Sequence, residues 1–157
     1  MKTFINFINE SSDSSSSKDG LIELLAKLEA LKLNYKANHW NASGDKSYGN
    51  HLLFQRLYEA MDADIDSLAE KITAYYGSGS ISALDVSNRM LDCVKEINPK
   101  NPINSSIIAE ESLQEYLKSV YERMKENKEM TLGLDDFIMA LANKHETNIY
   151  LLKQAKK

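Results

Sequence analysis

Residues 38–77 read NHWNASGDKSYGNHLLFQRLYEAMDADIDSLAEKITAYYG, and they are the most informative part of the sequence about the fold. The Asn-, Ser- and Gly-containing run at 41–47 has the composition of a turn between two helices. From Gly49 to Tyr76 there is no proline and no internal glycine. Over the same range apolar residues recur at helical spacing, namely Leu53, Leu57, Met61, Ile65, Leu68 and Ile72. The pattern predicts one continuous amphipathic helix.

The rest of the chain also predicts helices. Apolar residues at helical spacing indicate helices over about 21–40, 106–130 and 132–153, with a short one over 85–97. Ser47 suits an N-cap and Gly77 a left-handed C-terminal cap for the second helix. The connection between the second and third long helices, roughly 25 residues, is too long for a hairpin loop. Because no strand pattern competes, we predict an all-α, ferritin-like four-helix bundle with a long crossover containing a short helix.

Length and composition fit one domain. The chain has 157 residues, 43% of them hydrophobic, which is enough for a single core. The serine-rich run at 11–17 cannot bury apolar area, so we predict a flexible tail over 1–19 and a bundle domain over 20–157. The formal net charge of −4 argues against a surface that coats nucleic acid.

Cys93 is the only cysteine, which excludes an internal disulfide and a cysteine-based zinc site. A half-buried thiol in a reducing compartment is expected instead. No apolar run approaches the ~20 residues that span a bilayer, and no secretory signal is evident. We therefore expect a soluble, cytoplasmic protein.

Four residues are candidate metal ligands: His39, His51, Asp66 and Glu70, at spacings of 12, 15 and 4. Imidazole nitrogen and carboxylate oxygen suit iron, zinc and manganese. At ~1.5 Å of rise per residue, His51 and Asp66 lie about 22 Å apart along a helix. Metal–ligand bonds measure roughly 2.0–2.6 Å. One chain therefore cannot bring both residues to one ion.

A second chain can complete the set. His39 and His51 lie on either side of the predicted turn, so both imidazoles fall near the same end of the bundle. Fifteen residues return an ideal helix to within about 60° of its starting direction, so His51 and Asp66 share one side. Two chains related by a two-fold axis, with antiparallel second helices, would bring the histidines of one to the carboxylates of the other, twice per dimer.

Each residue also has an ordinary interpretation. A single helical histidine is commonly a surface or hydrogen-bonded core residue. An Asp66–Glu70 pair four apart is commonly a solvated face, and Trp40 is by default a core or interface anchor. The joint pattern favours the metal site.

The segment 38–77 resembles the Dps family, the DNA-binding proteins from starved cells, which are small ferritin-like cages. The histidines and the carboxylates have the spacing of that family's ferroxidase site without a gap. The residues that carry the resemblance are His39, Trp40, Asn41, Gly44, His51, the run Asp66–Lys71 and Gly77. The remaining helices match in length and order and only loosely in sequence.

The resemblance implies a function. Dps-like proteins form hollow dodecamers built from two-fold dimers, with iron at the dimer interface. His39 and His51 of one chain would face Asp66 and Glu70 of its partner. Iron(II) would be oxidised there by hydrogen peroxide or dioxygen, at a mono-iron or di-iron site that zinc can also occupy, and ferric mineral would collect in the cage. Trp40 would lie near the site and donate an electron.

This sequence departs from the family at Gln55, where an acidic residue is usual. An amide oxygen is a weaker, neutral ligand, which puts the second metal position in doubt. Asp62, one turn before Asp66, is a candidate to compensate. The alternative interpretation is a non-enzymatic structural or capsid-associated bundle with residual metal sites. The chain also lacks a Glu-x-x-His pair, which argues against a ferritin site inside one bundle.

Two positions on the later helices also carry ionisable side chains of interest. His145 falls on the apolar stripe of the last helix, so we expect a buried or interface histidine with a hydrogen-bond partner rather than a ligand. Glu110 and Glu111 are candidates to line a mineral cavity.

The two ends of the chain bear on partners and location. The last residues, KQAKK, are only mildly basic, and the tail has no net positive charge, so we expect DNA binding to be weak or absent. Residues 1–10, MKTFINFINE, resemble the leader that targets internal proteins into the capsids of T-even-like phages. Ile8-Asn9-Glu10 is similar to the cleavage signal of their prohead protease. This resemblance implies a phage-encoded protein of the host cytoplasm or virion interior; a docking or disordered N-terminus is the alternative.

Overall fold

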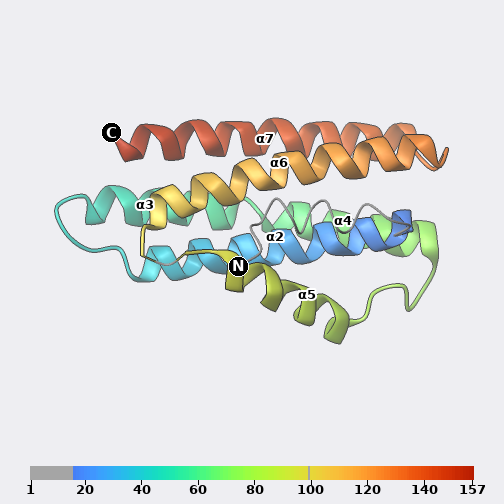
Figure 1. The fold of residues 1–157 in the computed structure, drawn as a ribbon, viewed down its shortest axis with the longest axis horizontal. Coiled ribbons are helices and arrows are strands. Elements are labelled where there is room, and N and C mark those ends of the chain that lie inside the picture. The colour runs from blue at the N-terminus through green and yellow to red at the C-terminus, as the bar shows by residue number, and fades with distance from the viewer. Residues whose placement is uncertain (1–15, 99) are drawn as a thin grey trace.

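The structure, a computed structural model, describes residues 16–98 and 100–157. Every regular element in these ranges is an α-helix (Figure 1). In chain order they are α2 (Ser17–Trp40), α3 (Ser47–Glu59), α4 (Asp62–Tyr76), α5 (Ala83–Glu96), α6 (Pro102–Glu126) and α7 (Leu132–Lys156). The predicted all-α class is confirmed. The predicted leader over 1–10 and most of the predicted tail lie outside the described residues.

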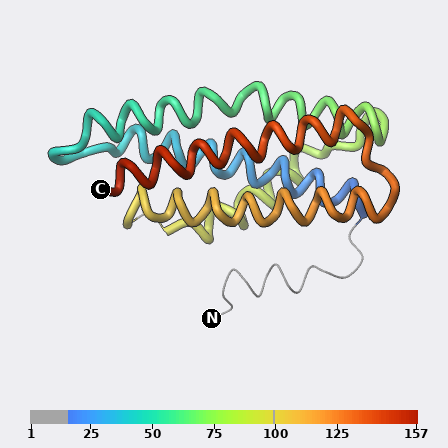
Figure 2. Tube along the Cα trace, turned by 90° about the horizontal axis from the view of Figure 1, so that it is seen from above, coloured from blue at the N-terminus to red at the C-terminus, as the bar shows by residue number. Residues whose placement is uncertain are grey.

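The bundle has four helical positions: α2, α3 followed by α4, α6, and α7. α2 packs against α3, α4 and α6, and α6 forms a hairpin with α7. The two views in Figures 1 and 2 place α3 and α4 one after the other along one side of the bundle, and Figure 1 shows α6 and α7 side by side in its other half. α5 is the short helix of the long crossover and packs on α2 outside the four-helix bundle. The predicted ferritin-like topology is therefore confirmed.

The core forms where the apolar stripes of these helices meet. α2 buries the most, because it lies between α3–α4 and α6 and is apolar on more than one side. Within the described residues α5 buries none of its side chains fully, so its packing on α2 is peripheral. The largest fully buried apolar side chains include Leu21, Leu24, Leu28, Tyr35, Phe54, Leu57, Leu68, Ile72, Leu117 and Leu134.

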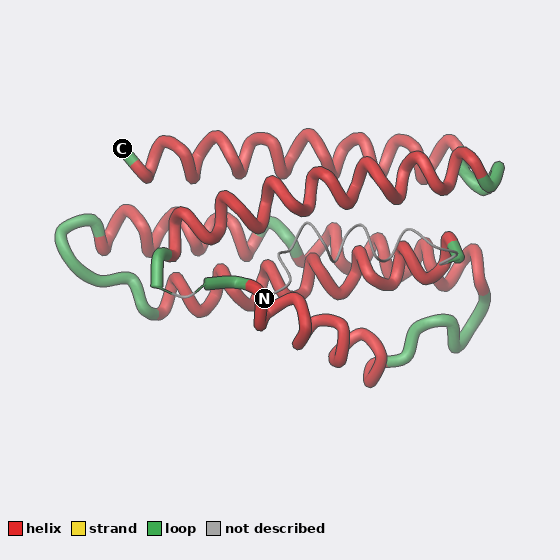
Figure 3. The backbone as a smooth tube through the Cα atoms, in the orientation of Figure 1, coloured by secondary structure: helices red, strands yellow, loops and turns green. Residues whose placement is uncertain are grey.

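The prediction of one continuous helix from Gly49 to Tyr76 is wrong in one place. The helix is interrupted at Ala60 and Met61, between α3 and α4, although both residues keep helix-like backbone angles. The Ala60 carbonyl accepts a hydrogen bond from the Lys144 ammonium of α7, which also pairs with Asp64. A carbonyl bonded to a side chain no longer needs its helical partner, so the break is stabilised from outside the helix. Figure 3 shows the interruption and the continued course of the chain.

Two helices begin earlier than predicted, because a side chain before each of them acts as its N-cap. α2 begins at Ser17, because the Ser16 hydroxyl accepts from the Asp19 amide. α6 begins at Pro102, with the Asn101 side chain as its N-cap. Ser47 is not an N-cap, since it is already the first residue of α3. Gly77 does end α4, as predicted, and its φ of 88° is one that glycine adopts without strain, but its ψ of 170° differs from that of the predicted left-handed cap.

Candidate metal centre

His39 and His51 meet across the first hairpin. His39 lies in the last turn of α2 and His51 near the start of α3. Their rings stack, with centroids 3.7 Å apart and an interplanar angle of 25°. The predicted placement of both imidazoles at one end of the bundle is thus found, and the two rings are in direct contact.

Reciprocal hydrogen bonds fix the orientation of both rings. The Nδ1 of His39 lies 2.9 Å from the backbone oxygen of His51, and the Nδ1 of His51 lies 3.1 Å from the backbone oxygen of His39. A carbonyl oxygen can only accept, so each Nδ1 carries the proton and donates it. In the neutral ring the lone pair is therefore on Nε2 in both residues. A hydrogen bond from the ring nitrogen that does not bind the metal orients a histidine for metal binding in this way.

Aromatic side chains surround the histidine pair. The Tyr58 ring meets His39 edge-on at 5.4 Å between centroids, and the Lys36 ammonium lies 5.7 Å from the Tyr58 ring centre. Trp40 is 68% exposed at the end of α2. Tyr48 and Leu52, which precede and follow His51 on α3, are also exposed. Several large apolar side chains next to the histidines in the chain are therefore exposed in the single subunit.

Asp66 and Glu70 lie one turn apart on α4, and both are exposed. Neither makes a hydrogen bond or ion pair with any residue in the described ranges, so neither carboxylate is committed to a structural contact. Asp66 lines an open groove between α2, α4 and α5. Other lining residues of this groove are Glu29, Lys32, Asp62 and Ser87. The groove therefore presents three carboxylates and one ammonium.

The other two candidate ligands, Asp62 and Gln55, both interact with side chains of their own subunit. Asp62 forms an ion pair with Lys32 across α2 and α4. The hydrogen bond from Lys32 lowers the pKa of the Asp62 carboxyl below its usual value. Gln55 donates from Nε2 to Glu59 Oε1 at 2.8 Å, which leaves its amide oxygen as an acceptor.

The two histidine rings are in contact, whereas the Asp66 and Glu70 carboxylates lie elsewhere, on α4. Nowhere in residues 16–98 and 100–157 do three or more His, Cys, Asp or Glu side chains come close enough to hold a metal ion. Each chain therefore carries two half-sets of donors, one nitrogen pair and one oxygen pair. Both half-sets are of the types that iron binds.

A buried polar cluster lies deeper in the bundle, and sequence reasoning found only part of it. Glu110 of α6 is fully buried, so its predicted role in lining a mineral cavity is wrong. Its Oε1 accepts from the Tyr35 hydroxyl and, at 3.0 Å, from the Asn148 amide, while its Oε2 accepts from His145 Nδ1 at 2.6 Å. His145 is thus buried with a partner, as predicted. Its Nε2 has no hydrogen-bond partner in the part of the chain that is described.

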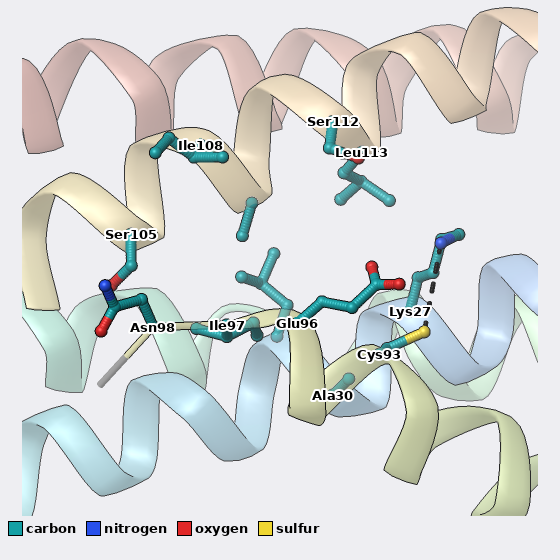
Figure 4. A pocket seen from close by; sticks show the side chains of 12 residues that line it. Lys27, Ala30, Cys93, Glu96, Ile97, Asn98, Ser105, Ile108, Ser112 and Leu113 are labelled. Carbon is teal, nitrogen blue, oxygen red and sulfur yellow. Dashed lines mark hydrogen bonds between the residues drawn. The ribbon is translucent and has the colours of Figure 1, made fainter. Parts of the chain in front are cut away.

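Cys93 borders a separate pocket between α2, α5 and α6, of about 150 Å³ (Figure 4). The Lys27 ammonium lies 4.0 Å from its sulfur, which in turn lies 3.8 Å from Glu23 Oε1. Burial raises the pKa of the Cys93 thiol to about 11. The half-buried thiol expected from the sequence is found, and it is protonated at neutral pH.

No helix in the described ranges has the length and apolar character needed to cross a membrane.

Comparison with known proteins supports the fold. No family model matches the chain. An uncharacterized protein of Haemophilus influenzae is 35% identical over 54 residues, a stretch that spans 34% of each chain. Among solved structures, Dps from Thermosynechococcus elongatus is 21% identical and covers 99% of this chain and 96% of its own, with a TM-score of 0.76. A Dps protein from Vibrio cholerae, described as a member of a superfamily of ferritin-like diiron-carboxylate proteins, is 18% identical with a TM-score of 0.74, covering 90% and 89%. The chain therefore has the fold of a Dps-like mini-ferritin.

Proposed function

We propose that this protein is a ferroxidase and iron store of the Dps type. It oxidises iron(II) with peroxide or dioxygen at sites shared between two subunits, and it holds ferric mineral in a cage assembled from two-fold dimers, most simply a dodecamer. The single observation that carries the proposal is the histidine pair. Two stacked imidazoles, each locked through Nδ1, present two Nε2 lone pairs at one end of the bundle.

The sharing of the site between chains is supported by what the single subunit leaves uncovered. Trp40 and Tyr48 flank the histidines and are exposed, and so are Leu84 and Leu91 on α5, beside the groove that contains Asp66. Exposed large apolar and aromatic side chains of this kind are typical of an interface between copies. A two-fold dimer would cover both regions and would bring the nitrogen pair of one chain to the oxygen pair of the other.

The donor set suits the proposed chemistry. Imidazole nitrogen binds iron(II) well enough to load the site, and the carboxylates of Asp66 and Glu70 favour the harder iron(III) product. Coordination positions of the iron that water would occupy can be taken by peroxide. Iron is here the substrate, and the Vibrio cholerae neighbour described as ferritin-like and diiron-carboxylate supports this assignment.

Anaerobic loading with iron(II) followed by peroxide tests the activity. Oxidation is read as the rise in ferric absorbance. We expect His39→Ala and Asp66→Ala to abolish the fast phase, and Glu146→Ala, which removes an exposed acid of α7 outside both half-sets, to leave it unchanged. No absorbance rise in the wild type, or an equal rise in the ligand variants, would refute the proposal.

Mixing two inactive variants tests whether each iron site is shared between two subunits. One variant lacks both histidines (His39→Ala with His51→Ala), and the other lacks both carboxylates (Asp66→Ala with Glu70→Ala). In a mixed dimer one site has lost all its ligands and the other is intact. Random reassembly of equal amounts therefore restores about a quarter of the sites if they are shared across a two-fold axis. A site built within one chain would restore none.

A second candidate function is favoured by Gln55 and by the Lys32–Asp62 ion pair, which both weaken the case for a second metal position. In that case the protein is a structural or capsid-associated bundle that binds a metal, such as zinc, without oxidising iron. Metal binding in a titration, with no ferric absorbance after peroxide, would establish this second function.

DNA binding is proposed to be weak. The lysines near the C-terminus are engaged with their own chain, since Lys153 pairs with Glu111 at 2.7 Å and Lys156 donates to Asn104 at 2.8 Å. A gel shift at physiological salt should show no tight complex.

A further inference from the structure

The pocket beside Cys93 is separate from the proposed iron site. It lies between α2, α5 and α6 and has a volume of about 150 Å³ (Figure 4). It shares no lining residue with the groove that contains Asp66, and neither His39 nor His51 borders it. A molecule bound in this pocket would therefore not compete with iron for the proposed ligands.

Apolar side chains form most of the pocket wall. Leu31 and Leu113 are each only 3% exposed, whereas Ile108 is 57% exposed, so the pocket extends from the core to the surface. The space is open because two small residues, Ala30 of α2 and Ala109 of α6, line it. An apolar cavity of about 150 Å³ accommodates one benzene ring, which limits the ligand to a single ring or a short branched chain.

Ionisable groups lie at one end of the pocket. Figure 4 shows the Glu96 carboxylate, the Lys27 ammonium and the Cys93 thiol on the same side. The Lys27 ammonium already lies 3.5 Å from Glu23 and 5.0 Å from the centre of the Tyr116 ring. No residue in the ranges 16–98 and 100–157 donates a hydrogen bond to Glu96 or forms an ion pair with it. Partial burial raises the pKa of the Glu96 carboxyl above its usual value and outweighs the opposite effect of Lys27.

The end of α5 adds to the negative potential at this side of the pocket. Glu96 is the last residue of α5. The last carbonyl groups of a helix have no partner within it and carry a partial negative charge. The basic residue of this last turn, Lys95, is already paired with Asp92 at 2.9 Å. The carboxylate and the helix terminus therefore both favour a cation.

We propose that this pocket binds a small primary amine with an apolar body. The ring or branched chain of the ligand lies between Leu31, Ile108 and Leu113, and its ammonium group contacts the Glu96 carboxylate. A protonated amine has three N–H donors, so it can also bond to carbonyl oxygens at the end of α5. A carboxylate of the same size would face Glu96 with a like charge and would be excluded.

Cys93 gives a direct readout of occupancy, because it borders the pocket and is the only cysteine of the chain. Its alkylation in the full-length protein is followed by mass spectrometry at one pH with benzylamine, benzyl alcohol or benzoate, which share one ring and differ in charge. We expect benzylamine to slow the reaction and benzoate to have no effect. Benzyl alcohol should need about tenfold higher concentration than benzylamine, because it lacks the charged hydrogen bond. Glutathione in parallel solutions corrects for any direct effect on the reagent.

Two variants locate the bound amine. Glu96→Gln keeps the shape of an exposed side chain and removes its charge, so benzylamine should become about tenfold weaker and benzyl alcohol should not change. Glu146→Gln, at an exposed position of α7, is the matched control. Ala109→Leu fills the pocket and should abolish protection by benzylamine, whereas Ala74→Leu, at an exposed position of α4, should not.

The inference would be overturned if benzylamine gave the wild type no protection, or if all three compounds protected Cys93 equally. Protection by benzylamine that is unchanged in Glu96→Gln, or that persists in Ala109→Leu, would overturn it as well. Because Glu96 is exposed, Glu96→Gln decides the question even if Ala109→Leu fails to fold.

Discussion

Lys144 offers a direct test of how the break between α3 and α4 is held. This lysine reaches from α7 to the Ala60 carbonyl and to the Asp64 carboxylate. Lys144→Met removes the charge and both hydrogen bonds while keeping most of the aliphatic length. The break lies between His51 and Asp66, so it also fixes the direction in which α4 presents its carboxylates.

The free energy of unfolding that Lys144→Met should lose depends on how far Lys144 and Asp64 are buried. Hydrogen bonds made by a charged donor contribute about 1.5–3 kcal/mol when buried, whereas exposed ion pairs contribute about 0–1 kcal/mol. The Lys144 side chain is 33% exposed and that of Asp64 is 23% exposed, so the contact lies between these classes. We expect a loss of about 1.5 kcal/mol, and at roughly 2–4 °C per kcal/mol for a chain of this size the melting temperature should fall by about 3–6 °C.

Thermal and urea unfolding at one protein concentration measure the loss, because assembly makes stability depend on concentration. Lys153→Met is the matched control. It removes another α7 lysine, whose pair with Glu111 has both side chains about half exposed, at 53% and 49%, and it should cost less than about 0.5 kcal/mol. Equal losses in the two variants, or an unchanged Lys144→Met, would refute the assignment of Lys144 as the residue that stabilises the break.

Three further outcomes are expected. Lys32→Met removes the ammonium from the groove and releases Asp62, so calorimetry should show tighter cobalt(II) binding than in the wild type; an identical isotherm would contradict this. With a thiol pKa of about 11, Cys93 should be alkylated slowly at neutral pH and faster as the pH rises toward that value, as followed by mass spectrometry; a rate at neutral pH like that of free cysteine would contradict the burial argument. Trp40 is the only tryptophan and is exposed in one subunit, so its fluorescence maximum should move to shorter wavelength on assembly; a solvent-like emission in the assembled protein would place it outside the interface.

Helical periodicity was sufficient to predict the bundle. The apolar stripes, the turn at 41–47 and the long crossover predict four long helices and one short one; the structure contains them, with the second long helix divided into α3 and α4. For His39 and His51, the sequence predicts only that the two side chains lie near each other. Their stacking and reciprocal hydrogen bonds depend on the detailed closure of the hairpin, which residue spacing does not determine.

The features that the sequence did not reveal depend on partners far away in the chain. Nothing near Ala60 signals a break, because the lysine that stabilises it is on α7. In the sequence Glu110 resembles an exposed acid near the start of a helix. In the fold it is buried and accepts hydrogen bonds from Tyr35 of α2 and His145 of α7. Local patterns predict local structure well, and a buried polar contact between distant segments has no local pattern.

The reciprocal hydrogen bonds of His39 and His51 affect the entropy of metal binding. Free imidazole side chains lose rotational freedom when a metal captures them, and that loss weakens binding. Here the hairpin has already removed this freedom on folding, since both acceptors are backbone oxygens that cannot turn aside. Metal uptake should therefore leave the order of the two rings almost unchanged, and the affinity of the nitrogen pair should depend on the integrity of the 41–46 loop as much as on the histidines themselves.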